Sequence, residues 1–211
     1  MSTIREEKIL SEQERKAFLS HELVVEEKID GANLGISFNT HGDVVLQNRG
    51  ALLVSPFVGQ WKHLSQWLSQ KVDRLLDLLS DRFILFGEWC YAKHSIHYSR
   101  LPDWFIGFDI FDKNENCFLS CQRRDQMLDG LSLAVVPQIG SGIYTLQDLK
   151  NSLLTSRFCD DLAEGVYLRY EQSDSLVQRA KLVNPYFTQA MTKHHWSREE
   201  ITPNRLELVS Q

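Results

Sequence analysis

Lys28 is the residue whose type and setting most clearly allow chemistry. It follows an apolar run and stands two residues before Asp30-Gly31, a turn signal, so we expect it at the end of a strand. Strand alternation places Lys28 and Asp30 on the same side. A lysine amine attacks a phosphorus or carbonyl centre only when unprotonated, so its usual pKa of ~10.4 has to be lowered by burial or neighbouring cations. Taken alone, the short K-x-D-G pattern favours a surface lysine beside a turn.

Further segments with charged or aromatic residues near expected strand ends follow in order. They are Asn48-Arg49-Gly50, Phe86-Gly87-Glu88-Trp89, Phe105-Ile106-Gly107-Phe108-Asp109-Ile110, Glu164-Gly165-Val166-Tyr167-Leu168-Arg169 and Arg179-Ala180-Lys181-Leu182. Glu88 and Glu164 carry hard oxygen ligands that suit Mg²⁺, although each also fits a salt bridge at a rim. Arg49 presents a fixed fork of donors that suits a phosphate, although it also fits a solvated turn. Such an ordered set is hard to obtain by chance.

In this order the segments resemble the motifs of the covalent nucleotidyltransferases, the superfamily of polynucleotide ligases and mRNA capping enzymes. Those motifs are KxDG, an Arg-Gly element, a GE element, an aromatic strand, EGxVxR and a basic strand, and the resemblance spans Lys28 to Lys181. The stretch from Gly87-Glu88-Trp89 to Leu101-Pro102-Asp103-Trp104-Phe105 is most similar to the ATP-dependent RNA ligases related to the phage enzyme that seals nicks in duplex RNA.

The resemblance implies a role for each matching residue. Lys28 would attack the α-phosphorus of ATP to give a lysyl-N-adenylate and pyrophosphate. Glu88 and Glu164 would bind a divalent metal. Phe108, which otherwise fits a core position, would stack on adenine. The implied catalytic set is Lys28, Asp30, Arg49 and Lys181, and the implied nucleotide-binding set is Glu27, Lys28, Asn33, Arg49, Glu88, Phe108, Glu164, Arg179 and Lys181.

Alternation adds detail at two strands. Arg179 and Lys181 are expected on one face of the last strand, where two cations can neutralise the α-phosphate. Ligases of this kind commonly carry two lysines there, so Arg179 keeps the charge but changes the geometry. Asp109 is expected on the face opposite Phe108, as a supporting carboxylate rather than a stacking neighbour.

The expected function is that of an ATP-dependent RNA ligase in RNA repair. It would transfer AMP to a 5′-phosphate and join that end to a 3′-hydroxyl, with ATP as co-substrate and Mg²⁺ or Mn²⁺ as cofactor. A DNA-nick-sealing ligase and a non-catalytic nucleotide-binding protein on a ligase fold are the alternatives. An mRNA guanylyltransferase is disfavoured because the stretch after the basic strand leaves no room for an OB-fold. An accessory protein would then supply RNA binding.

The order of expected elements indicates an α+β fold with antiparallel sheets. A capping box at Ser11 and Glu14 predicts a helix through about Leu19, and an antiparallel meander is expected over residues 23–25, 34–38 and 44–46. Apolar residues at helical spacing predict one continuous helix over residues 61–79. Further strands are expected at 82–86, 104–111, 165–170 and 176–183, a Gly-Ser-Gly loop at 140–142, and helices at 146–154 and from about residue 186. About the last ten residues are expected to fray.

Composition bounds these expectations. The chain has 211 residues, 43% of them hydrophobic, and a net charge of −5, so any contact with nucleic acid has to be a local basic patch. The longest apolar runs fall well short of the ~20 residues of a membrane span, and a cytoplasmic protein with four reduced cysteines and no structural metal is expected. We expect one nucleotidyltransferase (ligase adenylation) domain over residues 1–211, resembling the ATP-grasp-like ligase core without an OB-fold.

Overall fold

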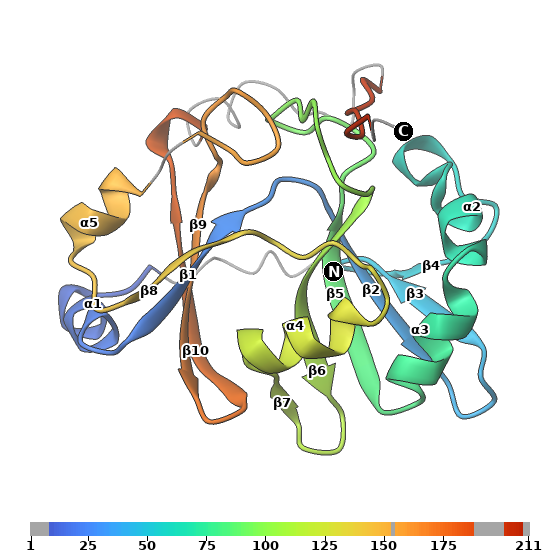
Figure 1. Ribbon diagram of the computed structural model, residues 1–211, viewed down its shortest axis with the longest axis horizontal. Coiled ribbons are helices and arrows are strands. Elements are labelled where there is room, and N and C mark those ends of the chain that lie inside the picture. Colours follow the sequence, from blue (N-terminus) through green and yellow to red (C-terminus); the bar gives the residue numbers. More distant parts are fainter. Residues whose placement is uncertain (1–8, 153–154, 188–200, 209–211) are drawn as a thin grey trace.

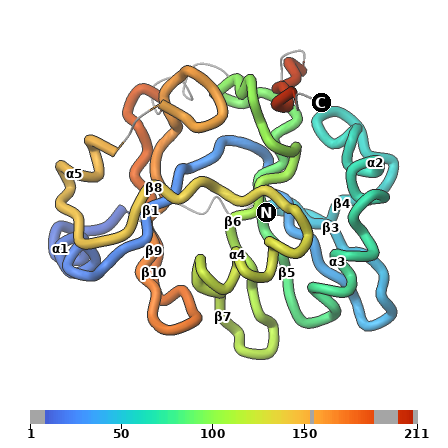
Figure 2. Tube along the Cα trace, in the orientation of Figure 1, coloured from blue at the N-terminus to red at the C-terminus, as the bar shows by residue number. Residues whose placement is uncertain are grey.

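Two antiparallel sheets dominate the computed structural model of the chain (Figure 1). The structure describes residues 9–152, 155–187 and 201–208. A four-stranded sheet has the order β10-β9-β1-β8, and a six-stranded sheet has the order β4-β3-β2-β5-β6-β7. Figure 2 follows the order of the chain. β1 belongs to the four-stranded sheet, β2 to β7 form the six-stranded sheet, and β8, β9 and β10 return to the four-stranded sheet.

The elements have the following bounds. The strands are β1 (Leu23–Lys28), β2 (Ala32–Phe38), β3 (Val44–Gln47), β4 (Leu52–Leu53), β5 (Phe83–Trp89), β6 (Phe105–Asp112), β7 (Cys117–Phe118), β8 (Gln138–Gly142), β9 (Gly165–Gln172) and β10 (Ser175–Val183). The helices are α1 (Glu12–Leu19), the short 3₁₀ helix η1 (Gly59–Trp61), α2 (Leu64–Ser69), α3 (Val72–Leu79), α4 (Cys121–Asp129) and α5 (Leu146–Asn151). None of the helices in the described ranges is long and apolar enough to cross a membrane.

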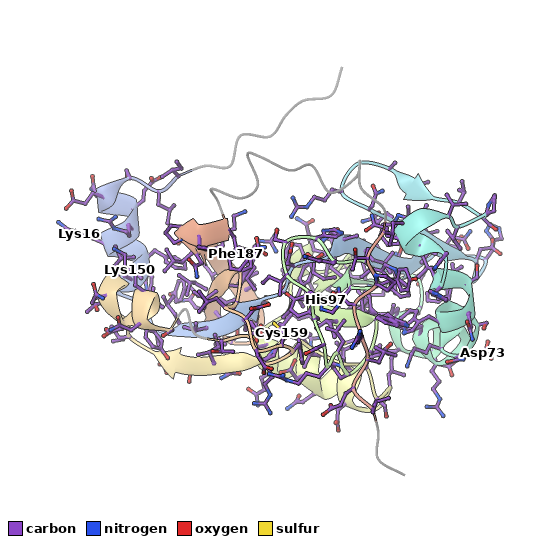
Figure 3. All side chains as sticks on the ribbon, turned by 90° about the horizontal axis from the view of Figure 1, so that it is seen from above. Lys16, Asp73, His97, Lys150, Cys159 and Phe187 are labelled. Atoms are coloured by element: carbon purple, nitrogen blue, oxygen red, sulfur yellow. The ribbon has the colours of Figure 1, made fainter. Side chains whose placement is uncertain are left out.

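Each sheet buries one face against helices. Leu34 of β2 and Leu85 of β5 pack with Leu64 and Leu75 of α2 and α3 in one core cluster. Val25 of β1 packs in another cluster, with apolar residues of α1, α5 and β9. Figure 3 shows the two helical ends of the molecule, with Lys16 and Lys150 at one and Asp73 at the other. Strand side chains alternate, so each sheet has a second face. Asp109 of β6 forms ion pairs with Arg169 of β9 and Arg179 of β10, so these second faces are turned toward each other.

The helix expected over residues 61–79 is wrong as a single helix. It is broken into η1, α2 and α3. At the end of α2 the amides of Gln70 and Lys71 bond to carbonyls three residues earlier, which tightens the last turn and ends the helix. Lys71 is the N-cap residue before α3, and its ammonium lies 3.4 Å from Asp103. Leu68 and Leu75 stay buried on either side of the break, so the apolar stripe gave no sign of it.

The expected meander is also wrong in part. β2 pairs with β3 as expected, but β1 pairs with β8 and β9 in the other sheet. The glycines expected in a loop at residues 140–142 belong to β8, opposite Val25 and Leu23 of β1. α5 ends at Asn151, and residues 153 and 154 of the expected helix lie outside the described residues. The helix expected from residue 186 also falls mostly outside them, with only residues 185–187 described as helical.

Other expectations are confirmed. Ser11 caps α1 and exchanges hydrogen bonds with Glu14 in a capping box. The strands around residues 83–89, 105–112, 165–172 and 175–183 are present. All four cysteines lie in the described part of the chain, and none of them forms a disulfide.

Candidate active site

One face of the four-stranded sheet collects the expected cations. Lys28 of β1 pairs with Gly165 of β9, Arg179 of β10 with Arg169, and Lys181 of β10 with Tyr167. The residues between them point the other way, since Ala180 and Leu182 pack with the core cluster behind the sheet. Lys28, Arg179 and Lys181 therefore share one face, as alternation predicted for the last two.

Lys28 is paired with Glu164. Its ammonium donates a hydrogen bond to the Glu164 carboxylate, and both side chains are largely buried. Burial raises the pKa of Glu164, and Lys28 opposes that shift. Gly165 makes this arrangement possible, because a Cβ there would lie 2.3 Å from the backbone oxygen of Leu182. Only glycine lets β10 approach so closely beside Glu164.

Glu88 and Asn33 face this sheet from the six-stranded one. They are direct cross-strand neighbours on β5 and β2, on the face opposite the helix-covered core. Oε2 of Glu88 is buried and has no hydrogen-bond partner within the described ranges. Burial raises the pKa of Glu88 to about 8, while the charges of Lys28 and Arg49 lower it. Glu88 is thus a partly buried acid whose buried Oε2 has no partner among the described residues and whose pKa is influenced by a lysine and an arginine.

Asp30 and Arg49 enter the same region from loops. The Asp30 carboxylate accepts from the amides of Ser95 (2.5 Å) and Ile96 (3.3 Å), and its own amide donates to Tyr98 Oη at 2.8 Å. Arg49 is exposed in the turn between β3 and β4, which is folded by hydrogen bonds from Gly50 and Ala51 to the side chain of Asn48. Its charge acts on Glu88, so this turn brings Arg49 to the site.

Phe108 stands at an irregularity of β6. Phe86 pairs with Asp109 but Gly87 pairs with Gly107, so Phe108 is the extra residue of a β-bulge. Its ring is partly buried against the cluster that contains Ile106. The expectation that Asp109 points away from Phe108 is wrong, because the bulge breaks the alternation. Asp109 instead reaches Arg169 and Arg179 of the facing sheet.

Glu27 occupies the side of β1 opposite Lys28. Its carboxylate accepts hydrogen bonds from Ser156 Oγ at 2.5 Å and from the amide of Arg157 at 3.0 Å. Burial raises its pKa, against the effect of those two bonds. The side chain holds the loop that leads to Glu164, and its expected contact with nucleotide stays a prediction.

A buried ionic network was not anticipated. Arg124 of α4 donates to Glu26 of β1 at 2.7 Å and to the carbonyl of Phe108 at 2.6 Å. Arg169 of β9 donates to Asp109, which also accepts from Arg179 at 2.7 Å. Arg169 is the last position of the EGxVxR segment, but nothing in the sequence showed its partners, which come from distant strands.

A family model described as RNA ligase matches residues 21–183. The chain belongs to the RNA ligase family. No curated protein matches this RNA ligase family chain.

Solved RNA ligases of Naegleria gruberi share the fold. One, described with PPi, has a TM-score of 0.64 and 17% identity over 82% of this chain and 52% of its own. A variant described with AMP and Mn has a TM-score of 0.66 and 15% identity over 90% of this chain and 59% of its own. Another, with ATP and Mn, has a TM-score of 0.63 and 16% identity over 83% and 53%. The chain thus spans about half the length of these relatives.

The site of this RNA ligase family chain brings together Lys28, Glu164, Lys181 and Arg179 from one sheet and Asn33, Glu88 and Phe108 from the other. Asp30 and Arg49 reach it from loops, and Glu27 lies on the far side of β1. It offers a primary amine in contact with a carboxylate, cations on the same face, and an unpaired acid opposite. These groups suit attack on a phosphate ester with charge neutralisation around it.

Proposed function

We propose that this chain is an ATP-dependent RNA ligase that carries AMP on Lys28. The observation that supports it most is the placement of Lys28, whose amine contacts Glu164 and faces the unpartnered acid Glu88. A buried carboxylate oxygen without a hydrogen-bond partner lowers the stability of the fold. Its presence opposite Lys28 therefore favours a functional role for the pair over a purely structural one. Solved relatives are described with ATP, AMP, PPi and Mn, which agree with this chemistry.

The first step forms a bond between Lys28 Nζ and the α-phosphorus of ATP. The bond from the α-phosphorus to the bridging oxygen breaks, and pyrophosphate leaves with that electron pair. The amine has to lose a proton before it attacks, and the Glu164 carboxylate in contact with it is placed to accept one. Arg179 and Lys181 on the same face stabilise negative charge on the α-phosphate.

The site fits a divalent cation bound together with nucleotide. Buried Oε2 of Glu88 is an oxygen ligand without a partner in the described structure, and Glu164 is close enough to affect its pKa. No three acidic, histidine or cysteine side chains of the described residues converge as a ready-made metal site. Mg²⁺ and Mn²⁺ are typically bound in this setting by one or two carboxylates plus phosphate and water oxygens. Such a cation would neutralise phosphate charge.

The later steps would transfer AMP to an RNA 5′-phosphate and then join that end to a 3′-hydroxyl with release of AMP. The family match supports RNA as the substrate, and a role in RNA repair follows from the sealing of broken ends. We propose that an accessory protein supplies RNA binding, because a net charge of −5 gives this chain no general positive field that attracts RNA.

Intact-mass measurement after incubation with ATP and Mg²⁺ or Mn²⁺ tests the first step. The wild type is expected to gain the mass of one AMP, and Lys28→Ala none. Lys16→Ala, in an exposed pair on α1, is the matched lysine control and is expected to react like the wild type. Absence of any gain in the wild type with either metal contradicts the proposed chemistry.

Sealing assays then separate the nucleic acids. The adenylylated protein is incubated with nicked duplexes whose broken strand is RNA or DNA, and with single-stranded RNA ends. Faster joining of RNA supports the proposal, and faster joining of DNA favours a DNA ligase. ATP binding without adenylylation would show a nucleotide-binding protein on a ligase fold.

A further inference from the structure

Residues 202–207, here called the strap, lie along the loop of residues 90–101 that follows β5. Figure 1 shows this red segment beside the green loop. Backbone hydrogen bonds join them from Lys93 to Thr202, from Arg205 to Tyr98, and in both directions at Leu101. Residues 202–207, part of the stretch expected to fray, are therefore paired with this loop through backbone hydrogen bonds and two isolated β-bridges.

Asn204 is the central contact between the strap and the loop. The residue is only 3% exposed. Nδ2 donates to the carbonyls of Cys90 (2.8 Å) and Ala92 (3.2 Å), and Oδ1 accepts from the amide of Tyr98 at 2.9 Å. The backbone amide of Asn204 also donates to the carbonyl of Tyr91. One buried amide thus fixes both ends of the loop segment 90–98.

The same loop segment holds Asp30. The amides of Ser95 and Ile96 donate to the Asp30 carboxylate, and Tyr98 Oη accepts from the Asp30 amide. The loop is also held elsewhere, since His94 contacts Gln60 Oε1 at 3.0 Å and the amides of Ser99 and Arg100 donate to the carbonyl of Phe158. His97, labelled in Figure 3, faces the strap through a contact of 3.1 Å to the carbonyl of Pro203. The loop thus connects Asp30 on one side with Asn204 on the other.

We propose that Asn204 is a positioning residue that acts through the loop to hold Asp30 in place for adenylylation of Lys28. The proposal rests on the proposed ligase function. Removing the Asn204 amide leaves two carbonyls and one amide of the loop without their buried partners, so the loop shifts to regain hydrogen bonds. The amides of Ser95 and Ile96 then no longer fix the Asp30 carboxylate. Asp30 lies two residues from the attacking amine, where small displacements cost much rate.

The first test compares single-turnover adenylylation in Asn204→Ala, Asn204→Asp and wild type at saturating ATP. Asn204→Asp keeps the acceptor for Tyr98 but loses both donors. We expect both variants to react slower by about 10- to 100-fold, as for a displaced reacting group. Asn39→Ala is the matched control. Its side chain also makes several hydrogen bonds within a loop, at the far end of β2. It is expected to keep the wild-type rate.

The second test asks whether Asn204 acts through Asp30. If it does, Asp30→Ala combined with Asn204→Ala reacts no slower than Asp30→Ala alone, whereas independent losses would multiply. Tyr98→Phe, which keeps the ring but removes the acceptor for the Asp30 amide, is expected to slow the reaction and to be equally non-additive with Asp30→Ala. Multiplying losses, or a wild-type rate in Asn204→Ala, overturn the proposal.

Hydrogen exchange separates failure of this inference from failure of the proposed function. The amides of residues 95–98 are expected to exchange faster in Asn204→Ala than in wild type or Asn39→Ala. That result supports the link between Asn204 and Asp30 even if Lys28 of the wild type acquires no AMP. Unchanged exchange at residues 95–98 contradicts the link, whatever the activity.

Discussion

Glu88 shows best what a single residue contributes to this site. Its Oε2 is buried without a partner among the described residues, and burial raises its pKa to about 8. A carboxyl of this kind binds a proton in the folded state at a pH where the unfolded chain has released it. The site is therefore destabilised by its own acid at neutral pH and above, unless a cation compensates.

The sign of this linkage gives a first prediction. Between the usual pKa of a glutamate and about 8, the folded chain binds one more proton than the unfolded chain, so stability falls as pH rises through this range. Glu88→Gln removes this loss. In EDTA, its melting temperature should match that of the wild type near pH 5 and exceed it near pH 8.5. A difference of ~1 kcal/mol corresponds to about 2–4 °C for a chain of this size.

Added Mg²⁺ or Mn²⁺ together with an ATP analogue is expected to close the gap at pH 8.5. A cation stabilises the ionised form of Glu88 and has no equivalent acid to bind in the glutamine variant. Equal pH profiles for the two proteins would show that Glu88 is ionised and paired in solution.

Phe108 gives a second prediction at the same scale. Its place at the bulge leaves the ring only partly covered. Phe108→Leu keeps an apolar side chain but removes the stacking surface, so we expect the ATP concentration for half-maximal adenylylation to rise. Loss of ~1–3 kcal/mol of stacking corresponds to about 5- to 150-fold.

Phe111→Leu is the control for this change. Phe111 lies on the same strand, with its ring 5.1 Å from that of Phe118. Its ATP dependence should stay that of the wild type. If the two variants require the same ATP concentration, Phe108 is a core residue and not a base-stacking one.

At the scale of elements, α4 connects the two sheets through hydrogen bonds of one buried side chain. Arg124 reaches Glu26 of the four-stranded sheet and the carbonyl of Phe108 in the six-stranded sheet. In Figure 1 the helix lies between the sheets. The bulge that presents Phe108 is thus held by a buried cation whose partner is two residues from Lys28.

Arg124→Ala should therefore lower both stability and site order. It leaves the Glu26 carboxylate buried beside Arg169 with its nearest partner gone, and breaking such a pair costs about 3–5 kcal/mol. Urea unfolding is expected to show that loss. Arg123→Ala, one residue away and without a buried acid, should cost less than about 0.5 kcal/mol. A similarly small loss of unfolding free energy in both variants would mean that the buried ionic network adds little to stability.

The elements also show where the sequence was informative. Strands around Lys28, Glu88 and Lys181 were predictable because short runs of apolar, β-branched or aromatic residues lie there. The helix α4 was not predictable. Its buried positions are Cys121, Arg124 and Leu128, and the arginine among them interrupts the apolar pattern that would indicate a helix. The break of two residues at Gln70 and Lys71 leaves the hydrophobic spacing intact, so the spacing could not reveal it.

The site residues divide in the same way. Lys28 and Glu88 could be named because each lies in a short ordered motif. Asn204 and Arg124 could not, since their importance depends on hydrogen bonds to residues far away in the chain. The bulge at Phe108 could not be predicted either, because it depends on the register between β5 and β6, and register is a property of two strands together.

At the scale of the whole molecule, the site exists only between the two sheets. Lys28 and Lys181 come from one sheet, with Glu164 directly before its strand β9, and Asn33, Glu88 and Phe108 come from the other. Inside the described structure, the facing surfaces are joined by charged pairs such as those of Asp109 with Arg169 and Arg179. A nucleotide that contacts both sheets adds a second connection between them.

Nucleotide binding should therefore stabilise both sheets together. With α,β-methylene-ATP, which cannot release pyrophosphate by breaking the natural bridge, the ligand stays in the first complex. At a concentration of 100 Kd the expected gain is about 2.7 kcal/mol, or roughly 5–11 °C in melting temperature. Hydrogen exchange should slow in β1 and β9 and also in β5 and β6, because ligand contacts with either sheet are lost when the sheets separate. Protection confined to one sheet would place the nucleotide outside the space between them, and the roles proposed for Glu88 and Phe108 would then be wrong.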